Sequence, residues 1–431
     1  MKISFLGGAR EVGRSCILLE GDNKKILLDC GVKLSRKEDE FPILEEKVDY
    51  ILITHAHLDH CGYLPHYLKK HNCKIICTKP TRDLAHILLA DYAKVSKSLG
   101  KESFSNEDLA KVLKNISYVE YWKKIFLKEG ISVCFHKAGH MLGSASIMIE
   151  LENKRFFYTG DISFRNSYLL EKGEDDLDSF NYLVMECTYG NKNLPSLKNA
   201  SNELIKTIKE TLQRKGKVLI PAFGVGRSQE IMLILDNYVR SKALPSLNAY
   251  CDGLIKKANR IYRQNVIYLK QEIINRILLG REDFFEKSIF KIPRTKDRSD
   301  ALSGDIIIAT SGMLTGGPAL YYFEKIAEDE RNCLILVGYQ AEGTLGRELL
   351  EGKKEVFLPN GKQINFNAQV KQISFSAHAD QAQLLNFLSK IKKPEKIFLV
   401  HGDEGNMLAF KKKIEHKFNV ETPRFGESFT L

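Results

Sequence analysis

Residues 54–62 read THAHLDHCG and follow the apolar run Tyr50–Ile53. That run is short and rich in isoleucine, which predicts a buried strand. Polar side chains therefore gather where a strand ends, the place where α/β folds put their sites. They are ligand types that zinc prefers, namely His55, His57, Asp59 and His60. Spacings of two, two and one do not easily direct all of them at one ion, but they can divide between two adjacent ions.

An isolated histidine is usually structural or solvent-facing, and we interpret His66, His71 and His86 in that way. The cluster at 55–60 differs because so many ligand-type groups close together are costly unless a cation or a hydrogen-bond network compensates. Cys73 and Cys77 lie near His71 and could bind a metal, but buried free thiols in a strand are the favoured interpretation. The sequence therefore predicts one metal centre, organised around residues 54–62.

The composition is that of a globular protein. The chain has 431 residues, of which 43% are hydrophobic and 28% charged, enough for two domains of ordinary size. The sequence contains no apolar run long enough to span a bilayer and no visible secretory signal. Its nine cysteines are scattered, which predicts reduced thiols in a cytoplasmic protein. The formal net charge of +11 favours a polyanionic partner, nucleic acid before membrane.

The pattern of an apolar strand followed by a ligand or acid–base residue and then a turn recurs along the chain. The sequence predicts strands at Lys2–Leu6, Ser15–Glu20, Lys25–Asp29, Ile131–Phe135, Ser146–Leu151, Arg155–Thr159, Tyr182–Met185 and Lys396–Val400. Candidate functional residues follow several of these strands: Asp29, His140, Asp161, Glu186 and His401. His378 precedes a helix that we expect to include Asp380 in its first turn. Another helix is expected over Thr81–Leu99, with Thr81 as its N-cap.

The character of the sequence changes after about residue 190. Strands predicted at Lys217–Ile220 and Asp305–Ala309 lead into the glycine-rich loops 221–227 and 310–318 and then into helices. Backbone N–H groups at the start of such a helix can bind a phosphate, and Arg227 lies beside them. For the first loop, glycines that only allow a tight turn are an equally good explanation. Residues 255–300 are expected to be helical and are basic, with Arg276 and Arg281 among the cations. Such a run is usually a solvated helix face, but it could be a wall for nucleic acid.

Taken in order, these residues resemble the metallo-β-lactamase superfamily and, within it, the β-CASP nucleases. The resemblance is carried by THAHLDHCG, GHMLGSAS, YTGDIS, MECTYG, FSAHAD and LVHGD, and between them by GVGRSQE, SGMLTGGP and GYQAEGTLGR. It covers the whole chain. The most similar branch contains the endonuclease subunit of the cleavage and polyadenylation specificity factor and its archaeal and bacterial relatives. The KH domains that precede some archaeal relatives have no counterpart in this sequence, so RNA selection is expected from the cleft or from partners.

The resemblance implies an α/β fold, an αββα metallo-β-lactamase sandwich with an inserted β-CASP domain built on a parallel sheet flanked by helices. The implied segments are residues 1–188 and 367–431 for the sandwich and 189–366 for the β-CASP domain. The implied cofactor is two Zn²⁺ per chain. His55, His57 and His140 would bind the first ion, Asp59, His60 and His401 the second, and Asp161 would bridge them. Asp29 would support the ligands from behind.

The resemblance also implies roles in catalysis. The implied catalytic residues are His378, Glu186 and Asp59, with Glu186 orienting His378 as a general acid. Two metal ions about 3.5–4 Å apart can hold a bridging hydroxide and clamp a phosphodiester. His378 could then protonate the leaving 3′ oxygen, so the products would be a 3′-hydroxyl and a 5′-phosphate. Contacts to RNA phosphates are expected from Arg227, Ser311, Gly312 and Ser376.

The predicted function is a zinc-dependent ribonuclease in RNA processing or decay. It would act as an endonuclease, with 5′-to-3′ exonuclease action as a second mode. Single-stranded RNA is favoured over DNA because the RNA-cleaving branch is similar to this chain in having histidine at the position of His401. The alternatives are a DNA-processing β-CASP nuclease, a small-molecule metallo-hydrolase, which would leave 190–366 without a role, and an inactive scaffold, which would be expected to lose ligands. A homodimer with a contribution from residues 423–431 is compatible with the resemblance.

Overall fold

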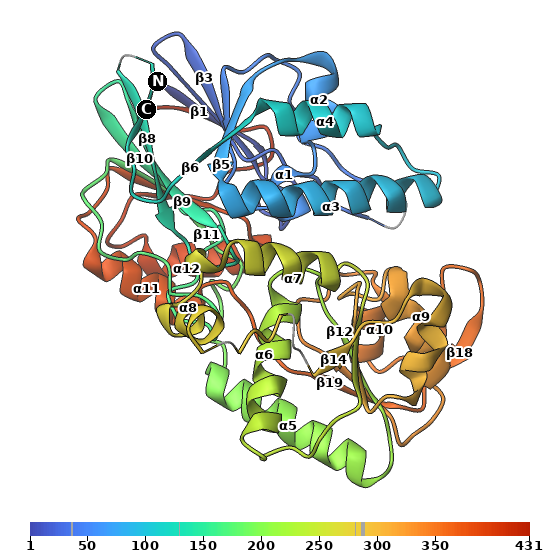
Figure 1. Ribbon diagram of the computed structural model, residues 1–431. Helices are drawn as coiled ribbons and strands as arrows, with labels where there is room; N and C mark the ends of the chain where they lie inside the picture. The colour runs from blue at the N-terminus through green and yellow to red at the C-terminus, as the bar shows by residue number, and fades with distance from the viewer. Residues whose placement is uncertain (36–37, 129, 281, 286–288) are drawn as a thin grey trace. The chain divides into compact units, whose positions relative to one another are not determined.

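The computed structural model describes residues 1–35, 38–128, 130–280, 282–285 and 289–431 (Figure 1). The chain forms two compact units. The first comprises residues 1–166, 170–193 and 377–431, and the second comprises 167–169 and 194–376. The domain limits 1–188, 189–366 and 367–431 stay a prediction, and Arg281 lies outside the described residues. Within the described ranges, none of the helices has the length and apolar character that a membrane crossing requires.

Two mixed sheets form the centre of the first unit. The first sheet has the order β22 (Ser428–Thr430), β1 (Lys2–Gly7), β2 (Cys16–Gly21), β3 (Lys24–Leu28), β4 (Tyr50–Leu52), β5 (Lys74–Thr78) and β6 (Ile116–Val119). The second has the order β21 (Val420–Glu421), β20 (Lys396–Val400), β11 (Tyr182–Glu186), β10 (Lys154–Tyr158), β9 (Ala145–Leu151), β8 (Ile131–Lys137) and β7 (Ile125–Lys128). The predicted antiparallel start of the chain is confirmed, since β1, β2 and β3 pair in that way. The termini lie side by side because β1 also pairs with β22 (Figure 1).

Helices cover the sheets of this unit. The helices are α1 (Leu58–Cys61), α2 (Leu64–Lys70), α3 (Lys79–Ser98), α4 (Asn106–Asn115), α11 (Gln381–Lys390) and α12 (Glu404–Ile414). The two sheets share one apolar core, in which Phe5 of β1 and Ile147 of β9 are fully buried. On the outer side of the second sheet, Phe387 of α11 and Phe410 of α12 pack in a cluster with Leu183 of β11. Helix α3 contacts β5 and β6 of the first sheet. The predicted αββα sandwich is therefore confirmed.

The second unit is built on a parallel sheet, as predicted. Its order is β14 (Phe290–Lys291), β13 (Ala249–Asp252), β15 (Ile306–Ala309), β12 (Val218–Pro221), β16 (Cys333–Leu336) and β19 (Gln369–Gln372), with every neighbouring pair parallel. The helical segments are α5 (Leu197–Gln213), α6 (Arg227–Arg240), α7 (Ile255–Gln264), η1 (Val266–Tyr268), α8 (Gln271–Leu278), η2 (Thr295–Ser303), α9 (Gly317–Ile326) and α10 (Leu345–Leu350). A hairpin joins β17 (Glu355–Phe357) to β18 (Gln363–Asn365).

Strand β15 shows why this sheet is apolar on both faces. Ile306 and Ile308 belong to the core cluster that includes residues of α5 and α6, whereas Ile307 and Ala309 belong to the cluster that includes residues of α9. Successive side chains of a strand point to opposite faces. A parallel sheet covered by helices on both faces therefore reads as a continuous apolar run and not as an alternation.

Three local predictions were wrong. Helix α3 is capped by Thr78, whose side chain accepts the N–H of Thr81, so Thr81 lies inside the helix. Asp380 is the N-cap of α11 and accepts the N–H of Gln383; it does not lie in the first turn. Residues 255–300 are not continuously helical, since α8 ends at Leu278 and the short strand β14 follows. Gly280 and Pro293 are helix breakers that explain this interruption.

Candidate metal centre

Ligand-type atoms of the first unit converge in one group behind β4. The imidazole nitrogens His55 Nε2 and His140 Nε2 each lie 3.2 Å from His57 Nδ1. Asp161 Oδ2 lies 3.5 Å from His55 Nε2 and 3.6 Å from His140 Nε2. All of these atoms lie within 4.8 Å of one another, a spacing that could hold a metal ion. The three histidines predicted to share an ion are thus brought together with the predicted bridging aspartate.

A second group adjoins the first and shares Asp161 with it. Asp161 Oδ1 lies 3.3 Å from His60 Nε2 and 3.1 Å from His401 Nδ1. The Nε2 atom of His401 also lies 3.4 Å from His60 Nε2 and 3.3 Å from Asp59 Oδ2. His60, Asp161 and His401 form one compact set, and Asp59 forms another with His55 and His60. Asp59 therefore lies at the edge of the second group and not at its centre.

Hydrogen bonds from behind fix how several histidines face this space. His60 Nδ1 lies 2.8 Å from Asp29 Oδ2, and His140 Nδ1 lies 3.0 Å from the carbonyl oxygen of Ala377. A ring nitrogen that donates a proton leaves its partner nitrogen with a lone pair for a metal. In His55 the Nδ1 atom lies 3.1 Å from Thr54 Oγ1. When Nδ1 donates its proton to this hydroxyl, Nε2 of His55 likewise keeps a lone pair for a metal. These contacts turn the Nε2 atoms of all three rings towards the centre.

Asp29 is the fully buried anchor of this outer layer. In addition to His60, its carboxylate accepts the backbone N–H of Thr54 at 2.8 Å and the hydroxyl of Tyr158 at 2.8 Å. Its φ of 59° and the φ of 49° at His401 lie in the left-handed region that side chains other than glycine rarely adopt. Such conformations persist where surrounding contacts determine them, and they are enriched at functional sites. The position predicted for Asp29, behind the ligands, agrees with these contacts.

The electrostatics of the site suit a cation. Burial lowers the pKa of His57 to about 4, and burial lowers the pKa values of His55 and His140 well below the usual range. Neutral imidazole is the form that binds a metal. Asp161 behaves differently: despite its burial, His401 and His60 hold its pKa well below the usual value, so it stays ionised.

One carboxylate oxygen of Asp161 favours a bound cation most directly. Asp161 Oδ1 is buried and accepts no hydrogen bond from any described residue. A buried carboxylate oxygen without a hydrogen bond is costly, although His60 Nε2 and His401 Nδ1 lie 3.3 Å and 3.1 Å from it. Burial alone would lower the pKa of His60, but the carboxylates of Asp161 and Asp29 raise it well above its usual value. Divalent cations between these atoms would compensate both effects, so the residues present fit the metal ions that the sequence predicts.

Glu186 and His378 form a separate pair beside the metal groups. His378 Nδ1 lies 3.0 Å and 3.1 Å from the two carboxylate oxygens of Glu186. Glu186 is fully buried and also accepts the backbone N–H of Ile162 at 2.8 Å. Although burial alone would lower it, Glu186 and Asp161 raise the pKa of His378 to about 9. The ring is therefore protonated at neutral pH, and its Nε2 atom lies on the side opposite Glu186.

Some contributors to the site were not identified from the sequence. The hydroxyl of Thr188 lies 3.4 Å from His378 Nδ1 and 3.3 Å from His401 Nδ1, and it donates to the carbonyl of His401 at 3.0 Å. Tyr158 and Thr54 contact Asp29, as described above. All three residues lie within or beside the quoted motifs. Their position at or just after a strand that carries a ligand is the sequence feature that could have identified them.

The residues predicted to contact RNA phosphates belong to the second unit. Arg227 is the first residue of α6, and Ser311 and Gly312 follow β15, whose partner β12 leads into the loop before Arg227. Ser376 follows β19. Most polar groups of the loop have internal partners: Ser311 Oγ lies 3.0 Å from Thr315 Oγ1 and accepts the N–H of Thr315 at 3.1 Å. Roles in RNA binding for these four residues stay predictions.

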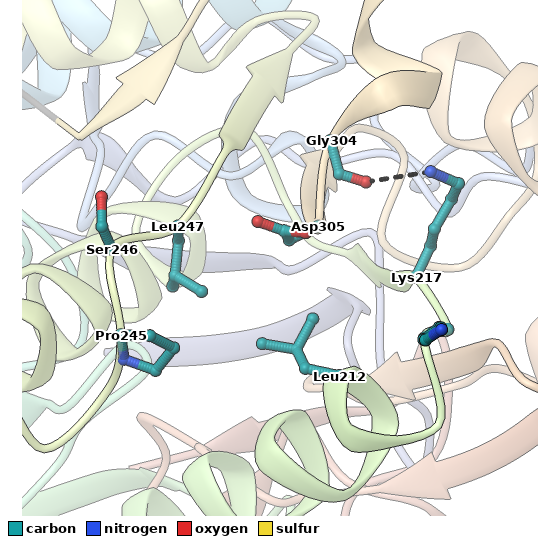
Figure 2. Close-up of a pocket in the computed structure, with 9 residues that line it drawn as sticks. Leu212, Lys217, Pro245, Ser246, Leu247, Gly304 and Asp305 are labelled. Atoms are coloured by element: carbon teal, nitrogen blue, oxygen red, sulfur yellow. Dashed lines mark hydrogen bonds between the residues drawn. The ribbon is translucent and has the colours of Figure 1, made fainter.

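A pocket of about 410 Å³ lies elsewhere in this unit, at the amino ends of β12, β13 and β15 (Figure 2). Figure 2 shows Lys217 at the right of the view, donating to the carbonyl of Gly304 at 3.4 Å. Among the described residues that line it, Asp305 is the one with a carboxylate, and it accepts the N–H of Asn248 at 2.8 Å. The pocket is thus at the opposite edge of the sheet from the glycine loops, and the described residues of its lining offer no acid–base pair.

Comparison with known proteins agrees with this site. Family models match the metallo-beta-lactamase superfamily over residues 9–212, the Beta-Casp domain over 228–349, and the Zn-dependent metallo-hydrolase RNA specificity domain over 363–423. The chain is 39% identical to an RNase J-like protein of Methanocaldococcus jannaschii, over 97% of both chains. It is 38% identical to transcription termination factor FttA of the same organism, over 98% of this chain and 70% of that protein.

A further relative is transcription termination factor FttA of Pyrococcus abyssi, 37% identical over 98% of this chain and 70% of that protein. A crystal structure of a protein of unknown function from Enterococcus faecalis V583 aligns with a TM-score of 0.56 and 14% identity, over 100% of this chain and 99% of that chain. That similarity concerns the fold alone. The matched domains and the identity to full-length relatives agree with the arrangement of strands and ligands described above. The chain therefore belongs to the β-CASP family of metal-dependent hydrolases within the metallo-β-lactamase superfamily.

Proposed function

We propose that this protein is a ribonuclease that hydrolyses RNA phosphodiester bonds at a centre of two zinc ions. The observation that carries the proposal is the position of Asp161. Its two carboxylate oxygens face two different groups of ligand atoms, and one of those oxygens is buried without a hydrogen bond from the described residues. A single ion would not use both groups. The RNA specificity domain and the RNase J-like relative support RNA as the substrate.

The ligand sets follow from the distances given above. His55, His57 and His140 would hold one ion, and His60 and His401 would hold the other with Asp59, while Asp161 would contact both. Asp29 and the carbonyl of Ala377 would keep His60 and His140 turned towards the ions. When bound, two such ions supply a water nucleophile that ionises near neutral pH and neutralise charge on the phosphodiester.

The protein's own residues would provide the proton for the leaving group. His378 is held at Nδ1 by the carboxylate of Glu186, so Nε2 is the atom that would donate to the 3′ oxygen. The raised pKa of His378 keeps that proton in place at neutral pH. Glu186 is fixed by the N–H of Ile162, which limits how far the ring can turn. A positioned acid of this kind contributes roughly 10²–10⁴-fold to a rate.

Endonucleolytic cleavage is the proposed main mode, with 5′-to-3′ exonucleolytic action as a second mode on the same site. A homodimer and a cytoplasmic location also stay predictions. DNA is the competing substrate, because the ligands and the acid would act on either phosphodiester.

The test combines a metal count with three RNA substrates. We expect about two zinc ions per purified chain, the number that a two-metal phosphodiesterase site requires. We also expect cleavage of a circular RNA, which has no end from which an exonuclease can start. RNAs of the same sequence with a 5′-triphosphate or a 5′-monophosphate measure the exonucleolytic share. A chain with no bound metal, or one that cleaves single-stranded DNA and leaves RNA intact, would contradict the proposal.

A further inference from the structure

An exposed tryptophan lies in the first unit, in the turn between β6 and β7. Trp122 is the only tryptophan of the sequence. Its side chain is 57% exposed, although a ring of this size is normally buried at least in large part. The exposed aromatic residues Tyr118 on β6 and Phe126 on β7 flank it in the sequence, at 58% and 72% exposure. Exposed aromatic side chains therefore recur at intervals of four residues in the sequence, on the edge strands of two sheets and in the turn between them.

Trp122 is exposed but held in place. Its backbone has a φ of 62°, which a bulky side chain rarely adopts. The backbone N–H donates to the carbonyl of Phe135 at 2.8 Å, and the indole N–H donates to the carboxylate of Glu174. Glu174 is itself fixed, because it also contacts His136 Nδ1 at 2.7 Å. A ring that is both exposed and oriented by several contacts is preorganised for a flat ligand and does not lose much freedom on binding.

Lys137 and Lys123 lie near Trp122, together with the exposed Glu120 and the carboxylate of Glu174. Lys137 places its ammonium group 5.0 Å from the centre of the tryptophan ring. Lys123 is exposed and makes no ion pair with any residue in the described ranges, whereas Lys124 pairs with Glu150. Two lysine charges beside an exposed ring suit a ligand that combines planar rings with negative charge. A second copy of this chain would bring the same lysines, and its formal net charge of +11 would add repulsion.

The turn is also connected to the metal centre. Tyr121, the neighbour of Trp122, donates its hydroxyl to the carbonyl of Ser144 at 2.9 Å. The hydroxyl of Ser144 accepts the backbone N–H of His140 at 3.1 Å, and His140 is one of the proposed metal ligands. The tryptophan and the loop that carries a ligand are therefore joined by two hydrogen bonds within one unit.

We propose that Trp122, with Lys123 and Lys137, is a stacking platform for a base of single-stranded nucleic acid outside the metal centre. This proposal rests on the proposed ribonuclease function and adds a position at which the substrate strand is held. Bases stack on exposed aromatic rings irrespective of sequence, and neighbouring lysines contact the phosphates. Duplex RNA hides its bases, so the platform selects single strands. Trp122 touches no reacting atom and acts as a positioning residue.

Because Trp122 is the sole tryptophan, its fluorescence reports on the platform alone. The titration uses the His378→Ala variant, so that the RNA stays intact, and a single-stranded oligoadenylate of about 20 nucleotides, longer than the site of one binding fold. We expect saturable quenching by this oligonucleotide and little by a duplex of the same length. Unchanged fluorescence at RNA concentrations that bind the protein would overturn the proposal. A fluorescence change that depends on protein concentration and not on RNA concentration would also overturn it, because the surface would then be a self-association contact.

Variants then measure the contribution to catalysis in the otherwise unchanged protein. Trp122→Ala is expected to raise KM for single-stranded RNA roughly 5-fold or more with little change in kcat, the effect of losing one stacked base. Trp122→Phe should retain most of the affinity, and Lys123→Gln should weaken the salt dependence of binding. Phe357→Ala is the matched control, since Phe357 is 64% exposed on β17 of the second unit. An equal effect from this control would overturn the proposal.

The two proposals can fail separately. Cleavage of RNA without quenching, and with a normal KM in Trp122→Ala, would overturn the platform and leave the ribonuclease function in place. Quenching by single-stranded RNA in a protein that cleaves no RNA would support the platform and overturn the ribonuclease function. If Trp122→Ala does not fold, as judged by thermal unfolding, the fluorescence titration and Lys123→Gln still decide the question.

Discussion

The metal centre of the first unit and the glycine loops of the second unit look alike in sequence and differ in structure. Both follow buried strands, and both combine glycine with polar residues. At the metal centre several ligand-type atoms face one another, and the buried Asp161 Oδ1 accepts no hydrogen bond from the described residues. In the loop after β15, Ser311 is already paired with Thr315. An unsatisfied buried group indicates a ligand more strongly than a glycine-rich strand end does.

The glycines of the second unit have a packing role that explains part of this difference. A Cβ atom on Gly312 would lie 2.9 Å from the backbone nitrogen of Phe223, so this position must be glycine for the neighbouring loops to approach. Gly226 N–H is occupied too, since it donates to Gln229 Oε1 at 2.8 Å. Arg227 remains the feature of this region that most favours a phosphate, through its charge at the start of α6.

Replacing Asp161 should have the largest effect. The Asp161→Ala variant removes both oxygens that face the two ligand groups, so we expect loss of bound metal and at least ~10³-fold lower RNA cleavage. Metal analysis and single-turnover cleavage measure the two effects. Asp305→Ala, at the pocket of the second unit, is the control and should keep its metal content. An active Asp161→Ala protein with a full complement of metal would contradict the bridging role.

Replacing His378 should separate catalysis from metal binding. His378→Ala removes the proposed acid but none of the proposed ligands, so metal content should stay unchanged while turnover falls by roughly 10²–10⁴-fold. His416→Ala, an exposed histidine of the same unit, should change neither quantity. Loss of metal from His378→Ala would show that this residue is a ligand, which the group of Glu186, His378 and His401 also permits by distance.

Changing Glu186 should alter the dependence on pH. Glu186 is the largest of the contributions that raise the pKa of His378 to about 9. The acid is therefore present below that pH, and cleavage should fall as the pH rises through about 9. In Glu186→Gln the negative charge is lost, so the decline should begin at a lower pH, and turnover at neutral pH should fall roughly 10- to 100-fold, as for a charged hydrogen bond. A pH–rate profile of both proteins tests this. If the decline at high pH occurs at the same pH in both proteins, Glu186 does not raise the pKa of His378.

The metal centre was more predictable from the sequence than its surroundings because its ligands are local signals. His55, His57 and His60 lie in one motif behind one strand, and the other ligands follow recognisable strands. The contacts of Thr188 with His378 and His401 join residues about 200 positions apart, and no spacing rule reveals them. The same limit applies to the carbonyl of Ala377, which any residue type could supply to His140.

Helix ends and edge strands were the weaker part of the fold prediction. Thr81 was expected to cap α3, but Thr78 does so, and Pro80 fits the first turn that follows Thr78. The short edge strands β6 and β7 were not predicted, because half of their residues are exposed and their pattern is too short to detect. The apolar strands β12 and β15 were predicted because burial on both faces gives them an uninterrupted signal.

The smallest expected effect concerns the glycine loops, where the comparison can be sharpened. Arg227→Gln should weaken RNA binding only about 3- to 10-fold and lower the salt dependence by about one phosphate contact. Arg227→Lys should restore the charge and most of the affinity. Ser311→Ala should have a smaller effect than Arg227→Gln, because the Ser311 hydroxyl is already used within its own loop. A larger effect of Ser311→Ala than of Arg227→Gln would mean that the loop opens its internal hydrogen bonds to receive a phosphate. The polar groups of the loop would then become available when RNA binds, whereas those of the metal centre are available before binding.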